Sequence, residues 1–265
     1  VLLAFVRRTA FTADTRVPAL YREGGVDAVL REVSLMSGDH ARRRYFEALF
    51  KATPSLSESE TRRALEIAGQ MDSDFEVAQT LIAIAKTGKI GGGSTAYLQA
   101  VRNIESDFET RRVLTTLVKS ATMDEEAMTL LLNVADNIES DFELAELLLA
   151  VSPRGLGSNN ARDAFFKAVA TIESNFERRR VLSSLLKRAD NSEEVQTRLL
   201  QSAAEIESDF ELASFLVSFA KKYPDMNAAM RDSFMKAADS IESEHEYGRV
   251  MQSVRGTARR TSGMF

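Results

Sequence analysis

A six-residue phrase recurs along this chain at a nearly constant interval. At residues 104–109 it reads I-E-S-D-F-E, the copies at 138–143 and 206–211 are identical to it, and the others are altered, most of all the copy that begins at Met36. The seven copies begin at Met36, Met71, Ile104, Ile138, Ile172, Ile206 and Ile241. Successive starts are 35, 33, 34, 34, 34 and 35 residues apart. Since a fixed period of roughly 20 to 50 residues is the signature of a repeat architecture, this spacing constrains the fold more than any other feature.

Each copy has the form of a helix start. In a Ser-x-x-Glu capping box the serine oxygen accepts a backbone N–H, and the glutamate reaches back to the serine's own N–H. The matching pairs are Ser73/Glu76, Ser106/Glu109, Ser140/Glu143, Ser174/Glu177, Ser208/Glu211 and Ser243/Glu246. An acidic residue after the serine places negative charge at the positive end of the helix dipole. We therefore expect a helix to begin at each copy, with the motif phenylalanine on its apolar face beside residues such as Leu114 and Leu117.

A second helix is predicted before each motif. Counting back from Ile172, positions −3, −6 and −7 are Val169, Phe166 and Phe165, which share one helical face and show no strand alternation. A helical hairpin of this kind cannot bury its apolar stripe alone, whereas stacked neighbours can. The chain is thus predicted to be all-α, an α-solenoid of stacked antiparallel hairpins with a 34-residue repeat. A closed helical bundle is the alternative.

A second period overlies the first. The three residues that begin two positions after the Phe position contain arginine in one repeat, here called arginine-type. In the next repeat the middle one is alanine, and that repeat is called alanine-type. Arginine-type sets lie at 42–44, 110–112, 178–180 and 247–249, and alanine-type sets at 77–79, 144–146 and 212–214. Hence the full period is 68 residues. Alanine-type units also carry turn-rich loops, at 87–93, 153–157 and 223–225.

The repeat count predicts three regions. Residues 1–38 form an irregular N-terminal capping hairpin with a loop through Pro18, residues 39–242 form six hairpin repeats, and residues 243–265 form a C-terminal capping helix. That last helix is expected to reach Val254 and to be followed by a frayed tail. The chain does not begin with methionine, and we expect it to be part of a larger protein.

Composition excludes several kinds of site. There is no cysteine, so disulfides and thiolate metal sites are out, and two histidines cannot form a multi-histidine cluster. No phosphate loop or nucleophile elbow occurs, and Gly91-Gly92-Gly93-Ser94 lacks the Lys that a phosphate loop needs. We predict no catalytic residue, metal or cofactor. His40 and His245 take the Phe position of the first and last motifs and are expected to mark the ends of the array.

The arginines of the arginine-type repeats are the first candidate binding residues. They could bind carboxylates or phosphates through paired hydrogen bonds, or they could instead form ion pairs inside the stack. This arginine ladder consists of Arg43, Arg44, Arg111, Arg112, Arg179 and Arg180.

Two further groups have a functional and a structural interpretation. Bulky aromatics of the second helices could line a pocket or fill the core; they are Tyr97, Phe165, Phe166 and Phe234. The acidic residues of the motifs could bind a basic peptide or calcium along one edge, or could serve only helix capping and solubility. No EF-hand spacing is present.

Paired helices of this length resemble the HEAT/armadillo group of solenoids over residues 20–254. The I-E-S-D-F-E phrase with its R-R-x-L continuation also resembles bacterial repeat arrays attached to membrane metallopeptidases related to beta-lactam sensors. Those peptidases need an H-E-x-x-H zinc motif, which this chain lacks, so their activity is not implied.

We interpret the chain as a non-catalytic scaffold or sensor module that presents an extended surface to a protein or peptide. A HEAT-like nucleic-acid-handling protein or helical-repeat enzyme is the alternative, and a consensus repeat without natural ligand is a third. The net charge of −5 argues against nucleic acid, and no apolar run approaches the roughly 20 residues that span a bilayer. The sequence favours neither a cytoplasmic nor a periplasmic location.

Overall fold

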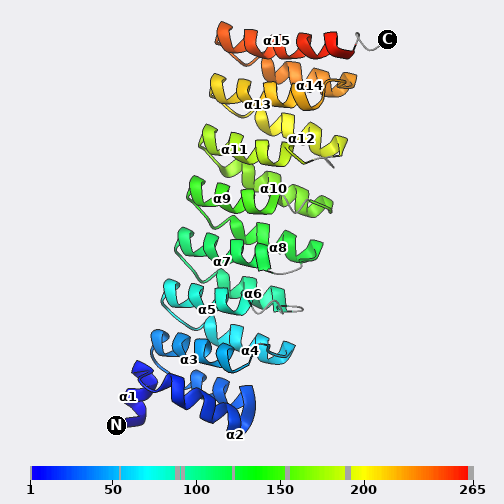
Figure 1. Cartoon of the computed structure of the whole chain (residues 1–265). Coiled ribbons are helices and arrows are strands. Elements are labelled where there is room, and N and C mark those ends of the chain that lie inside the picture. The colour runs from blue at the N-terminus through cyan, green and yellow to red at the C-terminus, as the bar shows by residue number, and fades with distance from the viewer. Residues whose placement is uncertain are drawn as a thin grey trace. The chain divides into compact units, whose positions relative to one another are not determined.

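The chain folds entirely into helices over the residues that the computed structural model describes. These are residues 2–53, 55–86, 90, 93–120, 123–152, 156–188 and 192–261, with backbone alone for Leu2 and 255–261. They form fifteen helices and no strand, which confirms the predicted all-α helical repeat solenoid (Figure 1). The chain divides into two compact units, Val1–Glu139 and Ser140–Phe265.

Eight helices build the first unit. They are α1 (Leu2–Thr9), α2 (Ala13–Ser34), α3 (Asp39–Ala52), α4 (Glu58–Ala68), α5 (Asp74–Lys86), α6 (Ser94–Val101), α7 (Asp107–Ser120) and α8 (Glu125–Ala135). Helix α5 packs between α3 and α7, and α6 packs between α4 and α8. The motif helices α3, α5 and α7 thus form one layer, here called the first layer, and α4, α6 and α8 form the second layer.

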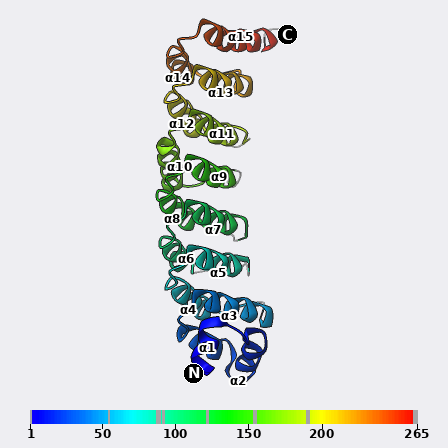
Figure 2. The same ribbon diagram turned by 90° about the vertical axis from the view of Figure 1, so that its left-hand side faces the viewer.

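Seven helices build the second unit in the same way. They are α9 (Asp141–Val151), α10 (Asn159–Thr171), α11 (Asn175–Leu186), α12 (Glu193–Ala203), α13 (Asp209–Lys222), α14 (Ala228–Ala238) and α15 (Glu244–Thr261). Helices α9, α11, α13 and α15 pack in sequence as its first layer, and α10, α12 and α14 as its second. Figure 2 shows the two layers of each unit from the side.

The apolar stripes meet between the layers. Leu114 and Leu117 of α7 are buried, and so are Leu131 and Leu132 of α8, as the helical spacing predicts. The motif isoleucine is buried where each motif begins, at 0% exposure for Ile172. Second-layer helices begin with their own caps, for example the Ser57 and Glu60 capping box of α4 and Ser158 at the start of α10. Each hairpin is therefore closed by apolar contact and capped at its own ends.

The N-terminal region differs from the predicted irregular loop. Pro18 lies inside α2, and the helical path is broken instead at Gly24 and Gly25, where Gly25 has a φ of 63°. Only glycine adopts that conformation without strain, so the kink falls at this pair. Beyond it, the buried carboxylate of Glu32 pairs with Arg7 (3.0 Å) and Arg16 (2.9 Å). Hydrogen bonding from Arg7 holds the pKa of Glu32 below its ordinary value.

The C-terminal helix is longer than predicted, because α15 continues past Val254 to Thr261. Residues 258–260, Ala-Arg-Arg, are strong helix formers, and the absence of an apolar period does not prevent a helix from continuing. The predicted loop segments at 87–89, 91–92 and 153–155 lie outside the described residues, as does the end of the tail at 262–265.

Candidate binding surface

The serine of every complete motif caps its helix as predicted. Its Oγ accepts the backbone N–H of the glutamate three residues later at 3.4 to 3.5 Å. The six serines are Ser73, Ser106, Ser140, Ser174, Ser208 and Ser243. The first-layer helix of each of these six repeats therefore begins at the same position of the motif.

The rest of the predicted capping box is wrong. The N–H of Ser174 donates to the carboxylate of Asp141 in the preceding repeat (2.7 Å), not to the glutamate of its own motif. The same contact joins the backbone of each later motif to the motif aspartate before it, or to Asn175, which takes the place of that aspartate in one motif. The joined pairs are Asp39 with Ser73, Asp74 with Ser106, Asp107 with Glu139, Asp141 with Ser174, Asn175 with Glu207 and Asp209 with Ser243. We call this contact the aspartate clasp.

The motif glutamates are engaged by arginines instead. Glu109 pairs with Arg112 (2.6 Å), Glu177 with Arg180 (2.5 Å) and Glu246 with Arg249 (2.6 Å), each three residues along one helix. Glu76 and Glu211, in alanine-type repeats, pair with Arg43 and Arg179 of the preceding arginine-type repeat. The glutamates thus neutralise cations within the first layer.

The 68-residue alternation has a structural cause in these contacts. The last arginine of an arginine-type set donates to the last residue of the alanine-type set before it. Arg180 pairs with Glu146 (2.7 Å), Arg249 donates to Ser214 (3.2 Å), and Gln79, with its amide oxygen turned toward Arg112, accepts at 3.0 Å. Arginine-type repeats therefore supply donors and alanine-type repeats supply acceptors.

The arginine ladder is brought together in the first layer of each unit, and carboxylates engage most of it. Arg43, Arg112, Arg179 and Arg180 have the partners given above, and Arg44 pairs with Glu47 (2.9 Å) and Asp14 (3.1 Å). Arg111 lies 5.1 Å from the ring centre of Phe108. The hydrogen bonds that Arg180 donates to the carboxylates of Glu146 and Glu177 raise its pKa. These contacts favour the structural interpretation of the ladder.

The four second-helix aromatics lie in the core. Tyr97 and Phe165 are fully buried, Phe234 is 1% exposed and Phe166 is 6% exposed. The Tyr97 hydroxyl donates to the backbone oxygen of Leu81 (3.0 Å). These residues fill space between the layers rather than line a surface pocket.

The motif phenylalanines lie on the surface, so their expected place on the apolar face is wrong. We call Phe75, Phe108, Phe142, Phe176 and Phe210 the Phe row. Their exposed fractions run from 49 to 57%. The exposed position of the motif phenylalanine could be predicted from the sequence, because residues three and four positions apart share a helix face. Phe108 therefore faces the same side as Arg111 and Arg112 and not the side of Leu114.

Cations stack on part of the Phe row. Arg179 and Arg180 lie 5.4 and 5.7 Å from the ring centre of Phe176, and Arg249 of the next first-layer helix lies 5.6 Å from that of Phe210. Within the described part of the chain, no cation or ring stacks on Phe75 or Phe142. These two belong to alanine-type repeats, which lack their own arginines.

An exposed acid stands three residues before each phenylalanine of the row. We call these the outer carboxylates: Asp72, Glu105 and Glu139 in the first unit, and Glu173, Glu207 and Glu242 in the second, where Glu242 precedes His245. Among side chains that the structure describes, none forms an ion pair with them. The motif edge thus combines half-exposed rings with unneutralised negative charge.

An open hollow of about 670 Å³ lies between two successive motifs of the first unit. Residues 69–75 line one side, including Asp72 and Phe75, and Asn103 and Glu105 line the other. Asp74 belongs to the wall formed by residues 69–75, and its carboxylate accepts the backbone N–H of Ser106 (2.8 Å). The aspartate clasp therefore fixes the two walls relative to each other.

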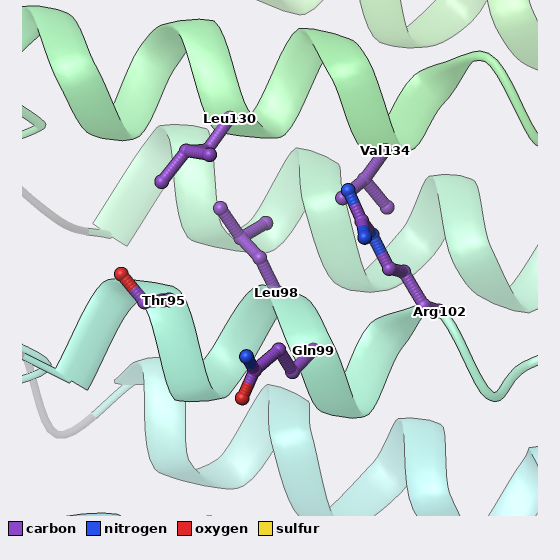
Figure 3. A pocket seen from close by; sticks show the side chains of 6 residues that line it. All are labelled: Thr95, Leu98, Gln99, Arg102, Leu130 and Val134. Atoms are coloured by element: carbon purple, nitrogen blue, oxygen red, sulfur yellow. The ribbon is translucent and has the colours of Figure 1, made fainter.

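A smaller hollow of about 170 Å³ lies on the second layer, between α6 and α8. Leu98, Leu130 and Val134 form its apolar part, and Thr95, Gln99 and Arg102 complete the lining (Figure 3).

Comparison with known proteins gives little. No protein-family model and no curated protein matches the chain. Among solved structures it is similar to a chain from "Computational Design of Self-Assembling Cyclic Protein Homooligomers", with 11% identity, a TM-score of 0.19, and coverage of 98% of this chain and 88% of that one. A similarity of this size has no bearing on function.

The described residues contain neither a metal-binding cluster nor a membrane-spanning helix. No group of three or more His, Asp or Glu side chains there is arranged to hold a metal ion. None of the helices in that part of the chain is long and apolar enough to cross a membrane.

Proposed function

We propose that this protein is a non-catalytic binding module and that the Phe row is where a protein or peptide partner docks. The carrying observation is the recurrence of a half-exposed phenylalanine at one position of five successive motifs. Aromatic side chains are enriched at protein interfaces, where their burial contributes strongly to binding. Packing in the core does not explain why the ring stays half exposed to water in all five of these motifs.

The architecture suits this role. Stacked repeats present equivalent side chains at regular intervals, which creates an extended surface for a long ligand. In this proposal the module is a HEAT/armadillo-like scaffold or sensing part of a larger bacterial protein. The arginines that stack beneath Phe108 and Phe176 hold the rings in place rather than bind the ligand directly.

A protein partner is favoured over nucleic acid by the charge of the same edge. The outer carboxylates lie beside the rings on which bases would have to stack, and they would repel phosphates. The ladder arginines, which could attract phosphates, are engaged by the motif glutamates and their neighbours.

The proposal is tested by selecting ligands from a displayed library of random 12-residue peptides on the whole chain. Selected peptides are then measured by fluorescence polarisation against wild type and the double variant Phe75→Ala, Phe108→Ala. Truncating aromatic contacts of this kind costs more than about 1 kcal/mol each at an interface, so we expect at least a tenfold loss of affinity.

The matched control is Leu35→Ala together with Phe11→Ala, since both side chains are exposed and lie off the Phe row. This control should bind as wild type does. The proposal fails if no peptide is enriched, or if the selected peptides bind both double variants equally well. Circular dichroism confirms that each variant remains helical.

A further inference from the structure

We propose that the partner of the Phe row is a basic, extended peptide segment with Lys or Arg at every third residue. This inference rests on the proposed function, and it names the chemistry of the ligand. Three observations carry it: the charge of the motif edge, the composition of the hollow beside Phe75, and the distance between repeats.

Within each unit the motif edge has three sets of acids. The motif aspartates accept backbone N–H groups, as Asp141 does from Ser174, and the motif glutamates pair with arginines, as Glu177 does with Arg180. The outer carboxylates, such as Glu173 and Glu207, form no ion pair with any described side chain. A partner that covers the rings must also cover these acids. Complementary charge lowers the cost of that burial and repels acidic competitors.

The hollow in the first unit has the groups that a cationic side chain needs. Asp72 and Phe75 belong to one of its walls, and Glu105 belongs to the other. An ammonium or guanidinium group is attracted both to carboxylates and to the face of an aromatic ring. No described cation stacks on Phe75, so this position is open to a cation from the partner, whereas Phe108 already carries Arg111 and Arg112.

The aliphatic part of the same side chain also finds a place. Lys and Arg bury their methylene stems on apolar surface while the charged group stays near water. About half of the surface of each residue in the Phe row is exposed and available for such contact. A basic residue therefore matches this edge better than a purely apolar or purely polar one.

The repeat distance sets the spacing of the ligand. Packed helices lie about 8 to 10 Å apart, which is the distance between successive motifs in one layer. A polyproline-type chain advances about 3.1 Å per residue and has three residues per turn, so every third side chain lies on the same side. In a β-type strand, residues three apart point to opposite sides. Three residues of a polyproline-type chain therefore span one repeat. The first unit offers the outer carboxylates Asp72, Glu105 and Glu139, so a peptide with basic residues at positions 1, 4 and 7 meets all three.

The test uses three labelled ten-residue peptides on the whole chain. The first has Lys at positions 1, 4, 7 and 10 with Ala and Leu between, the second has the same composition with the four Lys adjacent, and the third has Glu in place of Lys. We expect the first to bind best and to weaken as salt rises from 20 to 300 mM, since exposed charges are screened.

The variant Asp72→Asn with Glu105→Gln isolates the outer carboxylates. We expect it to bind the first peptide roughly three- to tenfold more weakly at low salt, as two exposed ion pairs would predict. The control variant Glu125→Gln with Glu126→Gln changes net charge by the same amount at the start of α8, away from the motif edge. It should bind as wild type does.

Other outcomes overturn the inference separately from the proposed function. If library peptides depend on Phe75 and Phe108 but the Glu peptide binds as well as the Lys peptide, the partner is not basic although the Phe row is a docking surface. Equal loss in both charge variants would assign the effect to net charge alone. Equal affinity for the adjacent-Lys peptide would refute the three-residue spacing, and tighter binding of a 12-base-pair duplex would refute a basic partner.

Discussion

The carboxylate of Asp39 accepts the backbone N–H of Ser73, 34 residues further along the chain, at 3.0 Å. One repeat thereby caps the helix that begins the next repeat. A backbone N–H at a helix start needs an acceptor, and here a neighbouring repeat supplies it rather than the helix's own glutamate. Helix initiation and repeat stacking consequently depend on the same bond.

Removing a clasp should therefore destabilise two neighbouring repeats. The carboxylate of Asp209 accepts the backbone N–H groups of Glu242 (3.3 Å) and Ser243 (2.8 Å). The variant Asp209→Ala removes the acceptor of both. We expect a loss of about 1 to 2 kcal/mol, as for other N-cap removals, measured from the urea midpoint. Asp209→Asn should lose less than half as much, because Asn175 makes the same bond with an amide oxygen. Equal losses would show that charge, not the acceptor, matters.

The interface between repeat types should show a measurable coupling. Arg180 bridges Glu146 and Glu177, so Arg180→Ala is expected to lower stability by about 1 kcal/mol, the upper part of the range for exposed pairs. A double-mutant cycle with Glu146→Ala should give a coupling of about 0.5 kcal/mol. The control is Arg231→Ala, an exposed arginine for which the described residues offer no ion-pair partner, and it should be neutral. Additivity in the cycle would mean that the Arg180–Glu146 pair contributes nothing.

Two phenylalanines of the second unit should respond very differently to truncation. Phe165 is fully buried, so Phe165→Ala should cost about 3 to 5 kcal/mol. Phe142 is 53% exposed, so Phe142→Ala should cost about 1 kcal/mol or less. Thermal and urea unfolding of both variants measure the difference. A cost for Phe142→Ala near that of Phe165→Ala would assign the Phe row to the core and remove the main support for a docking surface.

Glu32 should make the N-terminal region sensitive to acid. Its pKa is lowered in the folded state, chiefly by hydrogen bonds from Arg7, so its contribution is present above the unfolded pKa of about 4.3 and is lost as pH falls through the lower folded value. At pH 7, Glu32→Gln should cost about 2 kcal/mol, as expected for hydrogen bonds to a charged group. The difference from wild type should shrink steadily below about pH 4. A difference that is constant from pH 7 to pH 3 would contradict this assignment.

The order of helices was predictable because the motif combines a cap signal with a fixed period. Ser140 and Ser174 are correctly placed at helix starts, and the apolar spacing of α8 and α10 gives their buried faces. The kink at Gly25 was missed because Pro18 is a stronger breaker signal than two glycines, yet the helix tolerates it. Local signals thus locate elements better than they locate irregularities within them.

Partners across repeats could not be predicted in the same way. Helical spacing predicts an ion pair between Asp107 and Arg111 within one helix. The contact that spacing does not predict is the one from the backbone N–H of Glu139 to the carboxylate of Asp107, because only the stacking of repeats brings these groups together. The Phe row was misplaced for a simpler reason: residue type was given more weight than helix phase. Phe176 lies at the same side of α11 as Arg179 and Arg180, and that arrangement can be read from the spacing alone.

The donor and acceptor roles of the two repeat types limit how the chain can change in length. Loss of one alanine-type unit would set two arginine-type repeats side by side, leaving an arginine such as Arg180 facing another arginine where Glu146 now stands. Loss of one arginine-type unit would leave an acceptor such as Glu146 without its donor. Loss of a 68-residue pair would leave every arginine with a partner of the right kind. The smallest piece of this chain that can be duplicated or deleted without mismatching donors and acceptors is therefore a pair of hairpins. The number of hairpins can change only in steps of two.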